Sequence, residues 1–391
     1  MVRILDQANT GGPIAAETLD LVSEETNPPV PAGKTATLQD VADRCGLSKT
    51  TVRRALHGEG RALRPATFER VRAAAAEIGY DPEVHFAARS MGLRRQGRTA
   101  LNHTVAVFLP DDTLPDPYFF RMYQAICHTI SQAEFDIISV LRTPQEDQAR
   151  LPQNLLRGGA DGVLLFHNRL RSSAILERLR AVPGFGARPV VTLVEAIPDC
   201  SSVCADDYDG GYALATHLLQ LGHRRLLHFE ADGYRAVEAR IAGHRQACRD
   251  YGLDPDECLI CAQPPGGERE LLGVRLALLG ALERHPDVTA IFARNDYVAP
   301  WIVDCLERWG LRVPEDLSLV GFDEVRPLLN DRRENILTTV SVPLREMGRQ
   351  AAALLLDRIM GRATEDEHIV CPVSLVVRAS TAPPRPGLLS H

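Results

Sequence analysis

The spacing of apolar residues divides the chain into two parts with different periodicities. Between residues 37 and 78, apolar positions recur every three to four residues, which is typical of short amphipathic helices. From residue 102 onward, short runs of aliphatic and β-branched residues alternate with longer amphipathic segments, which predicts a parallel sheet covered by helices. Residues 1–33 are rich in Pro, Gly, Ala, Thr and acidic residues without either periodicity, so we expect a disordered N-terminal extension.

The first part is predicted to form three helices joined by tight turns, in a domain that spans residues 34–82. Thr37 and Asp40 have the spacing of a capping box, which starts a helix. Gly46 permits the sharp turn into a second helix that Ser48 caps. A third amphipathic helix over residues 67–78 opens after a proline and closes at Gly79. The pattern predicts an all-α helix-turn-helix domain.

The first half of the second helix carries a polar face made of Lys49, Thr50, Arg53 and Arg54. A recognition helix presents such residues to base edges in the major groove, where Arg forks onto guanine and a Thr hydroxyl or methyl contacts other bases. A solvated basic face is the alternative explanation of the same residues.

The second part predicts eight strands with helices between them. They are expected at residues 105–109, 136–141, 162–166, 190–194, 226–230, 259–262, 290–293 and 317–322. Because ligands of open α/β sheets bind at the carboxyl ends of strands, the polar residues just past those ends are the candidates for a ligand site. They are Asp111, Asp112, Asp116, Tyr118, Phe119, Glu195, Asn295, Asp296 and Asp323, with Arg240 on a helix. Carboxylates, an amide, a guanidinium and aromatic rings suit a sugar-like polyol, although Asp296 equally suits a helix N-cap.

Charge is distributed unevenly along the chain, whose formal net charge is -7. Residues 34–98 contain 13 Lys or Arg against 7 Asp or Glu, whereas the extension and the remainder are acidic. A basic head on an acidic body is expected where only the head meets phosphate. No apolar run reaches the length of a membrane span and no apolar leader opens the chain, so we expect a cytoplasmic protein. The scattered 9 cysteines, including Cys258 and Cys261, indicate ordinary thiols rather than a metal site.

The run TLQDVADRCGLSKTTVRRAL, continued by ERVRAAAAEIGYDP, resembles the head of LacI-type (LacI/GalR) transcriptional regulators. The resemblance implies base contacts by Lys49, Thr50 and Arg54, and phosphate contacts by Thr37, Ser48 and Thr51. Arg53 stands where the family usually has Ser and adds a base or phosphate contact.

The resemblance also implies that residues 83–98 form a hinge helix on the operator, with an apolar wedge in the minor groove. Arg89 is a contact there, and the wedge is Met91 or Leu93. A plain basic tether is the alternative explanation of this segment.

Further motifs extend the resemblance over residues 99–382, among them DPYFF, HLLQLGHRRLLHF, ARND and WGLRVPEDLSLVGFDE. The implied fold is an α/β periplasmic-binding-protein-like core with two subdomains, residues 102–196 with 341–362 and residues 197–340 with 367–382, followed by a tail over 383–391. The ligand positions that the resemblance carries over are Tyr118, Arg240, Asn295, Asp296 and Asp323, together with Glu195; Asp111 joins them from the pattern alone. An aromatic residue that often closes the family's pocket is missing from QPPGGERE.

Together these features predict a DNA-binding transcriptional regulator, a repressor, whose operator affinity is controlled by a small ligand of sugar type. A homodimer reading a pseudo-palindromic operator is the expected assembly, because no heptads follow the core. A sugar-binding protein without a DNA role is the alternative, which predicts a signal peptide and no basic head. No P-loop, nucleophile elbow or metal-spaced cluster is present, so neither an enzyme nor a cofactor is expected.

Overall fold

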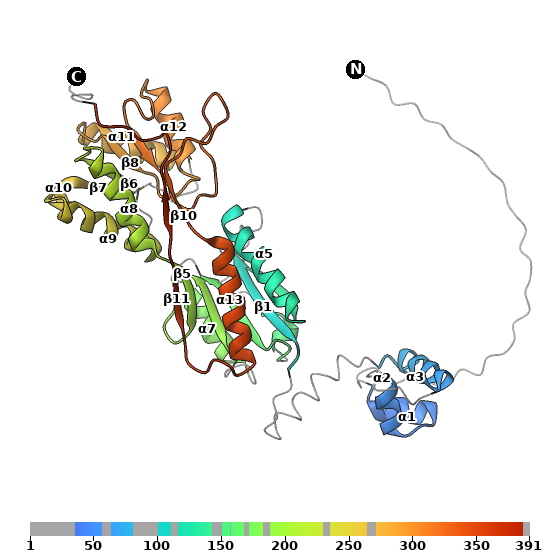
Figure 1. Ribbon diagram of the computed structural model, residues 1–391. Helices are drawn as coiled ribbons and strands as arrows, with labels where there is room; N and C mark the ends of the chain where they lie inside the picture. The colour runs from blue at the N-terminus through green and yellow to red at the C-terminus, as the bar shows by residue number, and fades with distance from the viewer. Residues whose placement is uncertain are drawn as a thin grey trace, which may run out of the picture. The chain divides into compact units, whose positions relative to one another are not determined.

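The computed structural model describes the chain in segments. They are residues 36–56, 64–80, 101–110, 116–142, 151–156, 158–167, 172–182, 188–229, 235–263 and 271–385. Contacts group the chain into two units, residues 1–86 and 87–391, here called the head and the core. Their elements are labelled in Figure 1, and each unit is described by itself.

The head consists of α1 (Leu38–Cys45), α2 (Lys49–Leu56) and α3 (Pro65–Glu77) around a small apolar centre. The predicted capping box is confirmed, since the Asp40 backbone N–H donates to Thr37 Oγ1 and the Thr37 N–H donates to Asp40 Oδ2. Gly46 has φ +60 and ends α1 in the left-handed conformation that the predicted turn requires. The three-helix prediction is therefore confirmed.

The core contains two parallel sheets. The six-stranded sheet has the order β11-β5-β4-β3-β1-β2, and the four-stranded sheet has the order β7-β6-β8-β9. The larger sheet comprises β1 (Thr104–Pro110), β2 (Asp136–Arg142), β3 (Gly162–His167), β4 (Val190–Val194), β5 (Ser201–Ala205) and β11 (His368–Cys371). The smaller comprises β6 (Leu226–Phe229), β7 (Leu259–Ala262), β8 (Ala290–Phe292) and β9 (Ser318–Val320). A short antiparallel pair, β10 (Thr339–Ser341) and β12 (Ser374–Val376), completes the strands of the described residues.

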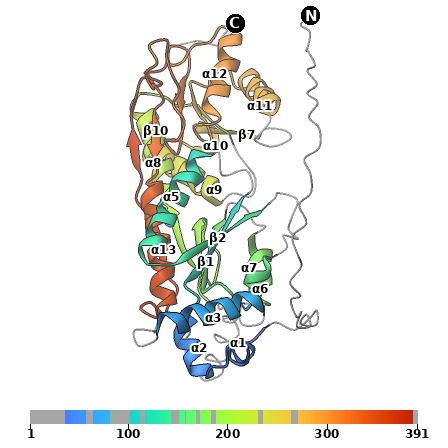
Figure 2. The same cartoon turned by 90° about the vertical axis from the view of Figure 1, so that its right-hand side faces the viewer.

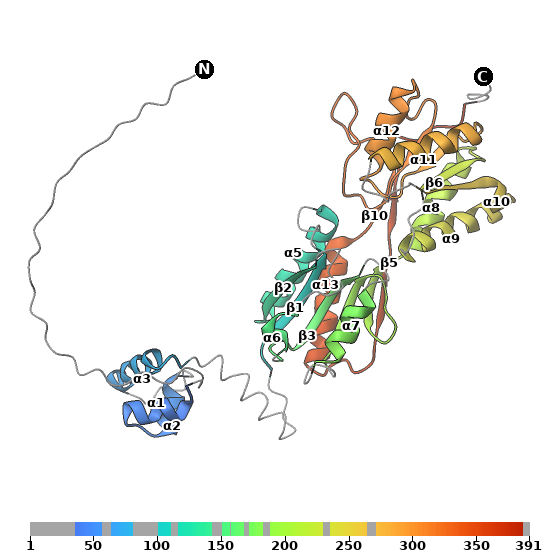
Figure 3. The same ribbon diagram turned by 180° about the vertical axis from the view of Figure 1, so that it is seen from behind.

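Helices cover both faces of each sheet. Those of the larger sheet are α5 (Pro117–Gln132), α6 (Gln153–Leu156), α7 (Ser172–Arg180) and α13 (Leu344–Ile359). Those of the smaller sheet are α8 (Asp207–Gln220), α9 (Arg235–Asp250), α10 (Pro255–Cys258), α11 (Leu271–Arg284) and α12 (Ala299–Arg308). Figures 1 and 3 show α13 and α7 on opposite faces of the larger sheet. In Figure 2, α5 and α13 lie on the same side of the core.

Alternate strand residues enter different apolar clusters, as expected for a sheet covered on both faces. In β1, Val105 and Val107 pack with residues of α5 and α13, whereas Ala106 and Phe108 pack with residues of α6 and α7. This alternation explains why the eight predicted strands are all present within two residues of their predicted ends, except that residue 230 lies outside the described residues.

Four strands were not predicted, and two of them alter the expected subdomains. β5 pairs with β4, and β11 pairs with β5, so both belong to the larger sheet. The expected division at residue 196 therefore falls too early, and the segment expected to return to the second subdomain at residue 367 first adds a strand to the first sheet. The chain crosses between the two sheets three times: after β5, before α13 and after β11.

The helices α8 and α9 approach each other closely through two glycines. A Cβ atom on Gly211 would lie 2.2 Å from the Arg240 carbonyl oxygen, and one on Gly243 would lie 2.2 Å from the Tyr208 carbonyl oxygen. The pairing fixes the position of Arg240, which α9 presents at the carboxyl ends of the strands.

We expect Gly243→Ala to lower the free energy of unfolding by about 1–3 kcal/mol, because backbone atoms cannot move aside as a side chain does. Urea-induced unfolding measures this change. Gly280→Ala is the matched control, since the nearest atom to its Cβ, on Arg284, is 3.9 Å away and alanine favours the helix interior by about 1 kcal/mol. Equal effects of the two substitutions would contradict the close packing.

Candidate functional site

The second helix of the head presents its polar residues to solvent. Lys49 and Thr50 are exposed, whereas Val52 and Ala55 of the same helix are 0% and 2% exposed. Ser48 caps α2, since its Oγ accepts a hydrogen bond from the Thr51 backbone N–H at 3.1 Å. The outward orientation that a recognition helix requires is thus present at two of the three positions to which base contacts were assigned.

Of the other positions predicted to contact DNA, the structure describes the side chains of some and not of others. The Thr37 hydroxyl donates to Asp40 Oδ2 at 2.6 Å, and the Ser48 and Thr51 hydroxyls are 2.8 Å apart, so all three are engaged in caps. Arg53 and Arg54 belong to α2, but their side chains lie outside the described residues. Arg89, Met91, Leu93 and Asp111 also lie outside them.

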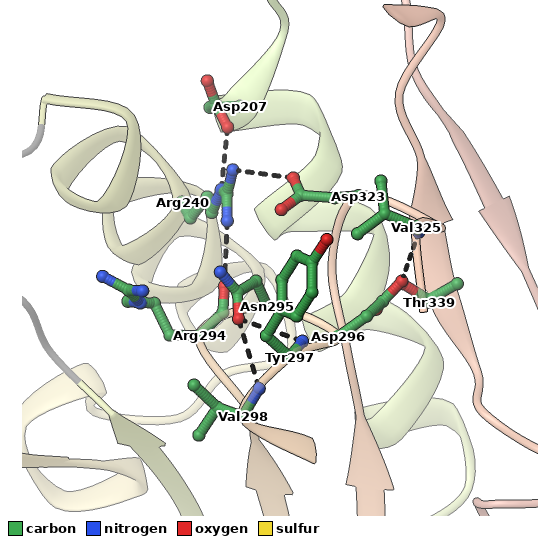
Figure 4. Close-up of polar contacts among 10 residues, drawn as sticks. All are labelled: Asp207, Arg240, Arg294, Asn295, Asp296, Tyr297, Val298, Asp323, Val325 and Thr339. Carbon is green, nitrogen blue, oxygen red and sulfur yellow. Dashed lines mark hydrogen bonds and ion pairs between the residues drawn. The ribbon is translucent and has the colours of Figure 1, made fainter. Parts of the chain in front are cut away.

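In the core, each sheet with its covering helices is here called a lobe. Arg240 joins three segments of the smaller lobe (Figure 4). Its Nε donates to Asp207 Oδ1 at 2.7 Å, its Nη2 to Asp323 Oδ1 at 3.3 Å and its Nη1 to the Arg294 carbonyl oxygen at 2.9 Å. The guanidinium carbon lies 3.5 Å from the centre of the Phe322 ring, a cation–π contact. Arg240, Asp207, Arg294 and Asp323, here called the Arg240 cluster, come from α9, the start of α8 and the segments after β8 and β9.

The two carboxylates of this cluster are buried. Asp207 and Asp323 are 8% and 6% exposed and share one guanidinium. Burial raises the pKa of Asp323 to about 6 and that of Asp207 in the same direction, and Arg240 opposes both shifts. Carboxylate oxygens held in this way accept hydrogen bonds from hydroxyl groups, which is the chemistry of polyol recognition.

Asp323 also has an unusual backbone. Its φ is +95, in a region that residues other than glycine seldom adopt, while its N–H donates to the Val340 carbonyl oxygen at 2.9 Å. Backbone strain of this kind persists only where neighbouring structure imposes it, and it is frequent at ligand sites.

Asn295 and Asp296 serve the segment after β8 in different ways. Asn295 Oδ1 accepts from the backbone N–H groups of Tyr297 and Val298 at 3.2 and 3.3 Å, which closes the turn before α12. Asp296 is 1% exposed and accepts from the Val325 N–H at 2.9 Å and the Thr339 hydroxyl at 2.7 Å (Figure 4). The helix-cap interpretation of Asp296 is therefore wrong, because α12 begins at Ala299 and the Asp296 carboxylate instead anchors the loop that carries Asp323.

Asp296 gives the protein a pH-dependent stability that can be tested. Burial raises its pKa from the ordinary 3.8 to about 7, and the Asp323 carboxylate adds to the shift. A carboxyl that binds its proton more tightly when folded stabilises the protein fully below pH 3.8, and this contribution is lost as the pH rises through about 7.

Asp296→Asn should therefore flatten the fall in unfolding free energy across this pH range. The slope that it removes is at most about 1.4 kcal/mol per pH unit, the value for one proton. Denaturant unfolding at a series of pH values measures the slope. Asp304→Asn is the control, because Asp304 is paired with Arg308 on the surface and its pKa is lowered. An unchanged slope in the Asp296 variant would contradict the assignment.

Residues of the larger lobe contact the segments that carry Asp296 and Asp323. The Tyr297 hydroxyl donates to Asp116 Oδ1 at 2.7 Å, and Arg121 Nη1 donates to the Glu324 carbonyl oxygen at 3.2 Å. Tyr118, half-buried at the start of α5, has its pKa raised by burial and by the nearby Asp323 and Asp207 carboxylates.

Glu195 follows β4 and is 4% exposed. Burial raises its pKa, while backbone hydrogen bonds from Ala236 and Arg235 at the start of α9 oppose the shift. Tyr118, Glu195, Arg240, Asn295, Asp296 and Asp323 thus all lie where the carboxyl ends of the two sheets meet.

Three residues of this region were absent from the predicted site: Asp207, Arg294 and Tyr297. Asp207 follows β5, a strand with too few aliphatic residues to stand out, so its position at a strand end was not visible. Arg294 contributes its backbone carbonyl, which no sequence pattern marks. Tyr297 directly follows the predicted Asn295 and Asp296, so adjacency was the available signal.

A three-helix head with an outward polar helix, together with a two-sheet core that gathers buried polar groups at its strand ends, defines a ligand-responsive class of DNA-binding regulator. Family models agree with both parts: residues 37–83 match the bacterial regulatory proteins of the lacI family, and residues 215–381 match the periplasmic binding protein-like domain. The chain belongs to the lacI family of bacterial regulatory proteins, and it is a DNA-binding transcriptional regulator.

Similar proteins support this assignment over most of the chain. The transcriptional regulator CelR of Thermobifida fusca is 30% identical over 351 residues, which are 88% of this chain and 98% of that protein. The transcriptional repressor CytR of Escherichia coli K12 is 29% identical over 350 residues, 88% of this chain and 96% of its own.

Solved structures show the same architecture. The structure of a CelR–cellobiose complex superimposes with a TM-score of 0.61 at 28% identity and covers 88% of this chain and 99% of its own. The lac repressor dimer bound to operator, at 22% identity and a TM-score of 0.63, covers 89% of this chain and all of its own, and it supports the fold. Among the residues that the structure describes, no helix has the length and apolar character needed to cross a bilayer.

Proposed function

We propose that the protein is a cytoplasmic repressor that binds a pseudo-palindromic operator as a homodimer and changes its operator affinity when a sugar occupies the core. The observation that carries the proposal is the Arg240 cluster, because it places hydrogen-bonding groups of both charges at the strand ends of one lobe, opposite Asp116 and Tyr118 of the other. Relatives described as a sucrose operon repressor and a regulator–cellobiose complex support a sugar as the ligand class.

In this proposal Lys49, Thr50 and Arg54 contact bases, while Thr37, Ser48, Thr51 and Arg53 contact phosphates or bases beside them. The hinge over residues 83–98, with Arg89 and a wedge at Met91 or Leu93, completes the DNA contact. Tyr118, Glu195, Arg240, Asn295, Asp296 and Asp323, together with Asp111, surround the ligand. The core residues serve binding and not turnover, so the protein is not an enzyme.

The ligand shifts DNA affinity only by its difference in affinity between two arrangements of the lobes. The hydrogen bonds from Tyr297 to Asp116 and from Arg121 to Glu324 join the lobes directly, so a ligand that strengthens or breaks these contacts changes the angle between them. The head would receive this change through the hinge.

A ligand panel followed by a DNA-binding assay tests the proposal. Mono- and disaccharides are first screened for stabilisation of the full chain in a thermal unfolding experiment, where a ligand at 100 times its Kd adds about 2.7 kcal/mol. A stabilising sugar is then added to the protein on its selected DNA site. We expect the operator affinity to change by at least about fivefold. A sugar that stabilises the protein but leaves DNA affinity unchanged would contradict the coupling, and sugar turnover would contradict the binding role.

A further inference from the structure

Two buried thiols lie together where α9 meets α10. Cys248 is in the last turn of α9, and Cys258 is the last residue of α10. They are 0% and 3% exposed, belong to the same apolar cluster, and are joined by a hydrogen bond between their side chains. In the sequence Cys258 stands closest to Cys261, so its pairing with Cys248 arises from the fold.

The turn between the two helices fixes this arrangement. The Cys248 carbonyl oxygen accepts a hydrogen bond from the Leu253 N–H at 2.9 Å. The Cys258 N–H donates to the Asp254 carbonyl oxygen, also at 2.9 Å. Gly252 has φ +70, a conformation that lets the chain reverse directly after α9. The backbone, and not a flexible side chain, therefore brings the two sulfurs together.

The surroundings of the pair favour a thiolate at Cys248. The hydrogen bond from Cys258 lowers the pKa of Cys248, against the opposing effect of burial. The nearby Arg245 and Arg249 guanidiniums lower this pKa further, and Arg245 is itself paired with Asp256 of α10. The same hydrogen bond raises the pKa of Cys258, which keeps its proton and donates it. Because the thiolate is the nucleophile in cysteine chemistry, Cys248 is the reactive member of the pair.

A surface turn covers the two sulfurs. Asp254, Asp256 and Glu257, which directly precede Cys258, are exposed. The helix α10 has four residues and so few internal hydrogen bonds that its local opening needs much less free energy than unfolding of the core. Such opening gives a molecule of nearly the size of water access to the pair.

We propose that Cys248 and Cys258 form a reversible disulfide when the protein meets hydrogen peroxide. The Cys248 thiolate attacks the peroxide and breaks its O–O bond, which leaves a sulfenic acid on Cys248 and releases hydroxide. Cys258 Sγ then attacks the sulfenic sulfur. The S–S bond forms, the S–O bond breaks, and the Cys258 proton leaves with the hydroxyl group as water. The two thiols lose two electrons, which the peroxide gains, and reduction by a small thiol restores both groups.

The disulfide ties the last turn of α9 to α10 and closes the loop between residues 248 and 258. Such a cross-link stabilises a protein mainly by limiting its unfolded chain, so the thermal midpoint should rise on oxidation. Since α9 also carries Arg240, about two helical turns before Cys248, the cross-link restrains the helix that holds the Arg240 cluster. The reaction itself requires neither DNA nor a sugar.

Peptide mapping of the peroxide-treated full chain tests the proposal. After treatment, the remaining thiols are blocked with N-ethylmaleimide and the protein is digested with trypsin. Mass spectrometry should find the peptide of residues 246–249 joined to that of residues 250–269, with Cys261 blocked, and dithiothreitol should release the two peptides. The oxidised protein should also unfold at a higher temperature than the reduced one.

Cys258→Ala should lose both the joined peptides and the shift in thermal midpoint, and dimedone should then trap the sulfenic acid on Cys248. The matched control is Cys261→Ala, which removes an exposed thiol three residues away and should form the cross-link as the wild-type protein does. Absence of the joined peptides from a folded, peroxide-treated wild-type protein would overturn the assignment. An equal yield of cross-link in Cys258→Ala, formed through Cys261, would also overturn it.

Discussion

Replacing Arg54 by Ala is expected to weaken binding to the selected DNA site by about 1–3 kcal/mol while changing binding to random DNA little. The reason is that a guanidinium forked onto a guanine contributes to one sequence only, whereas a phosphate contact contributes to all sequences. Arg54 belongs to α2, whose neighbouring Lys49 and Thr50 are exposed. Titration of labelled DNA with purified protein at one fixed salt concentration measures both affinities.

The matched control is Arg70→Ala, which removes an exposed cation from α3 of the same head. Its effect should be equal on the selected and the random site. If Arg54→Ala also weakened both sites equally, Arg54 would be a phosphate contact and the base-reading assignment would be wrong.

Arg240→Ala is expected to abolish the response to ligand and to leave binding to the DNA site intact in the ligand-free protein. Removal of the guanidinium leaves Asp207 and Asp323 buried and close together without their shared cation, so the strand-end geometry is lost along with one hydrogen-bonding group. Leaving a buried partner uncompensated costs about 3–5 kcal/mol, so the unfolding free energy should fall as well. DNA titration with and without the stabilising sugar gives the response.

Arg245→Ala is the control for this effect. Arg245 lies on the same helix, one turn and a residue further on, and it pairs with Asp256 at the surface. The variant should keep the wild-type response. A normal ligand response in a folded Arg240→Ala protein would reject the Arg240 cluster as the ligand site.

Much of the architecture was predictable because the strands of the larger part carry strong local signals. β1, β3, β4, β6 and β8 are runs of buried aliphatic residues between amphipathic helices, and periodicity alone identifies them. The head was predictable for a related reason, since the cap at Thr37 and the left-handed Gly46 are local events.

The missed strands depend on partners distant in sequence. β11 has an exposed Val370 and becomes a strand by pairing with β5, about 165 residues earlier, as His368 opposite Ser202 shows. β10 and β12 are three residues each and pair with one another, and β10 also bridges to Asp323 through Ser341. No local pattern distinguishes such segments from loops. The same is true of β5, and because that strand was missed, the predicted subdomain boundary at residue 196 falls too early.

The candidate ligand site was predictable as a group of strand-end residues but not in its internal connections. Position along the chain indicated Arg240, Asp323 and Asn295, whereas the pairing of Arg240 with Asp207 depended on the unpredicted β5. Asp296 illustrates the opposite error, because its sequence position suited a helix cap but its carboxylate is used by Val325 and Thr339, from segments beyond β9.

The most direct test of the account is the selection of DNA from a random pool by the purified full-length protein, repeated with the Arg54→Ala variant. The account predicts that the wild-type protein enriches one pseudo-palindromic sequence and that the variant loses preference at a single symmetric pair of positions within it. Enrichment of no common sequence by a folded wild-type protein would contradict the assignment of α2 as the helix that reads DNA.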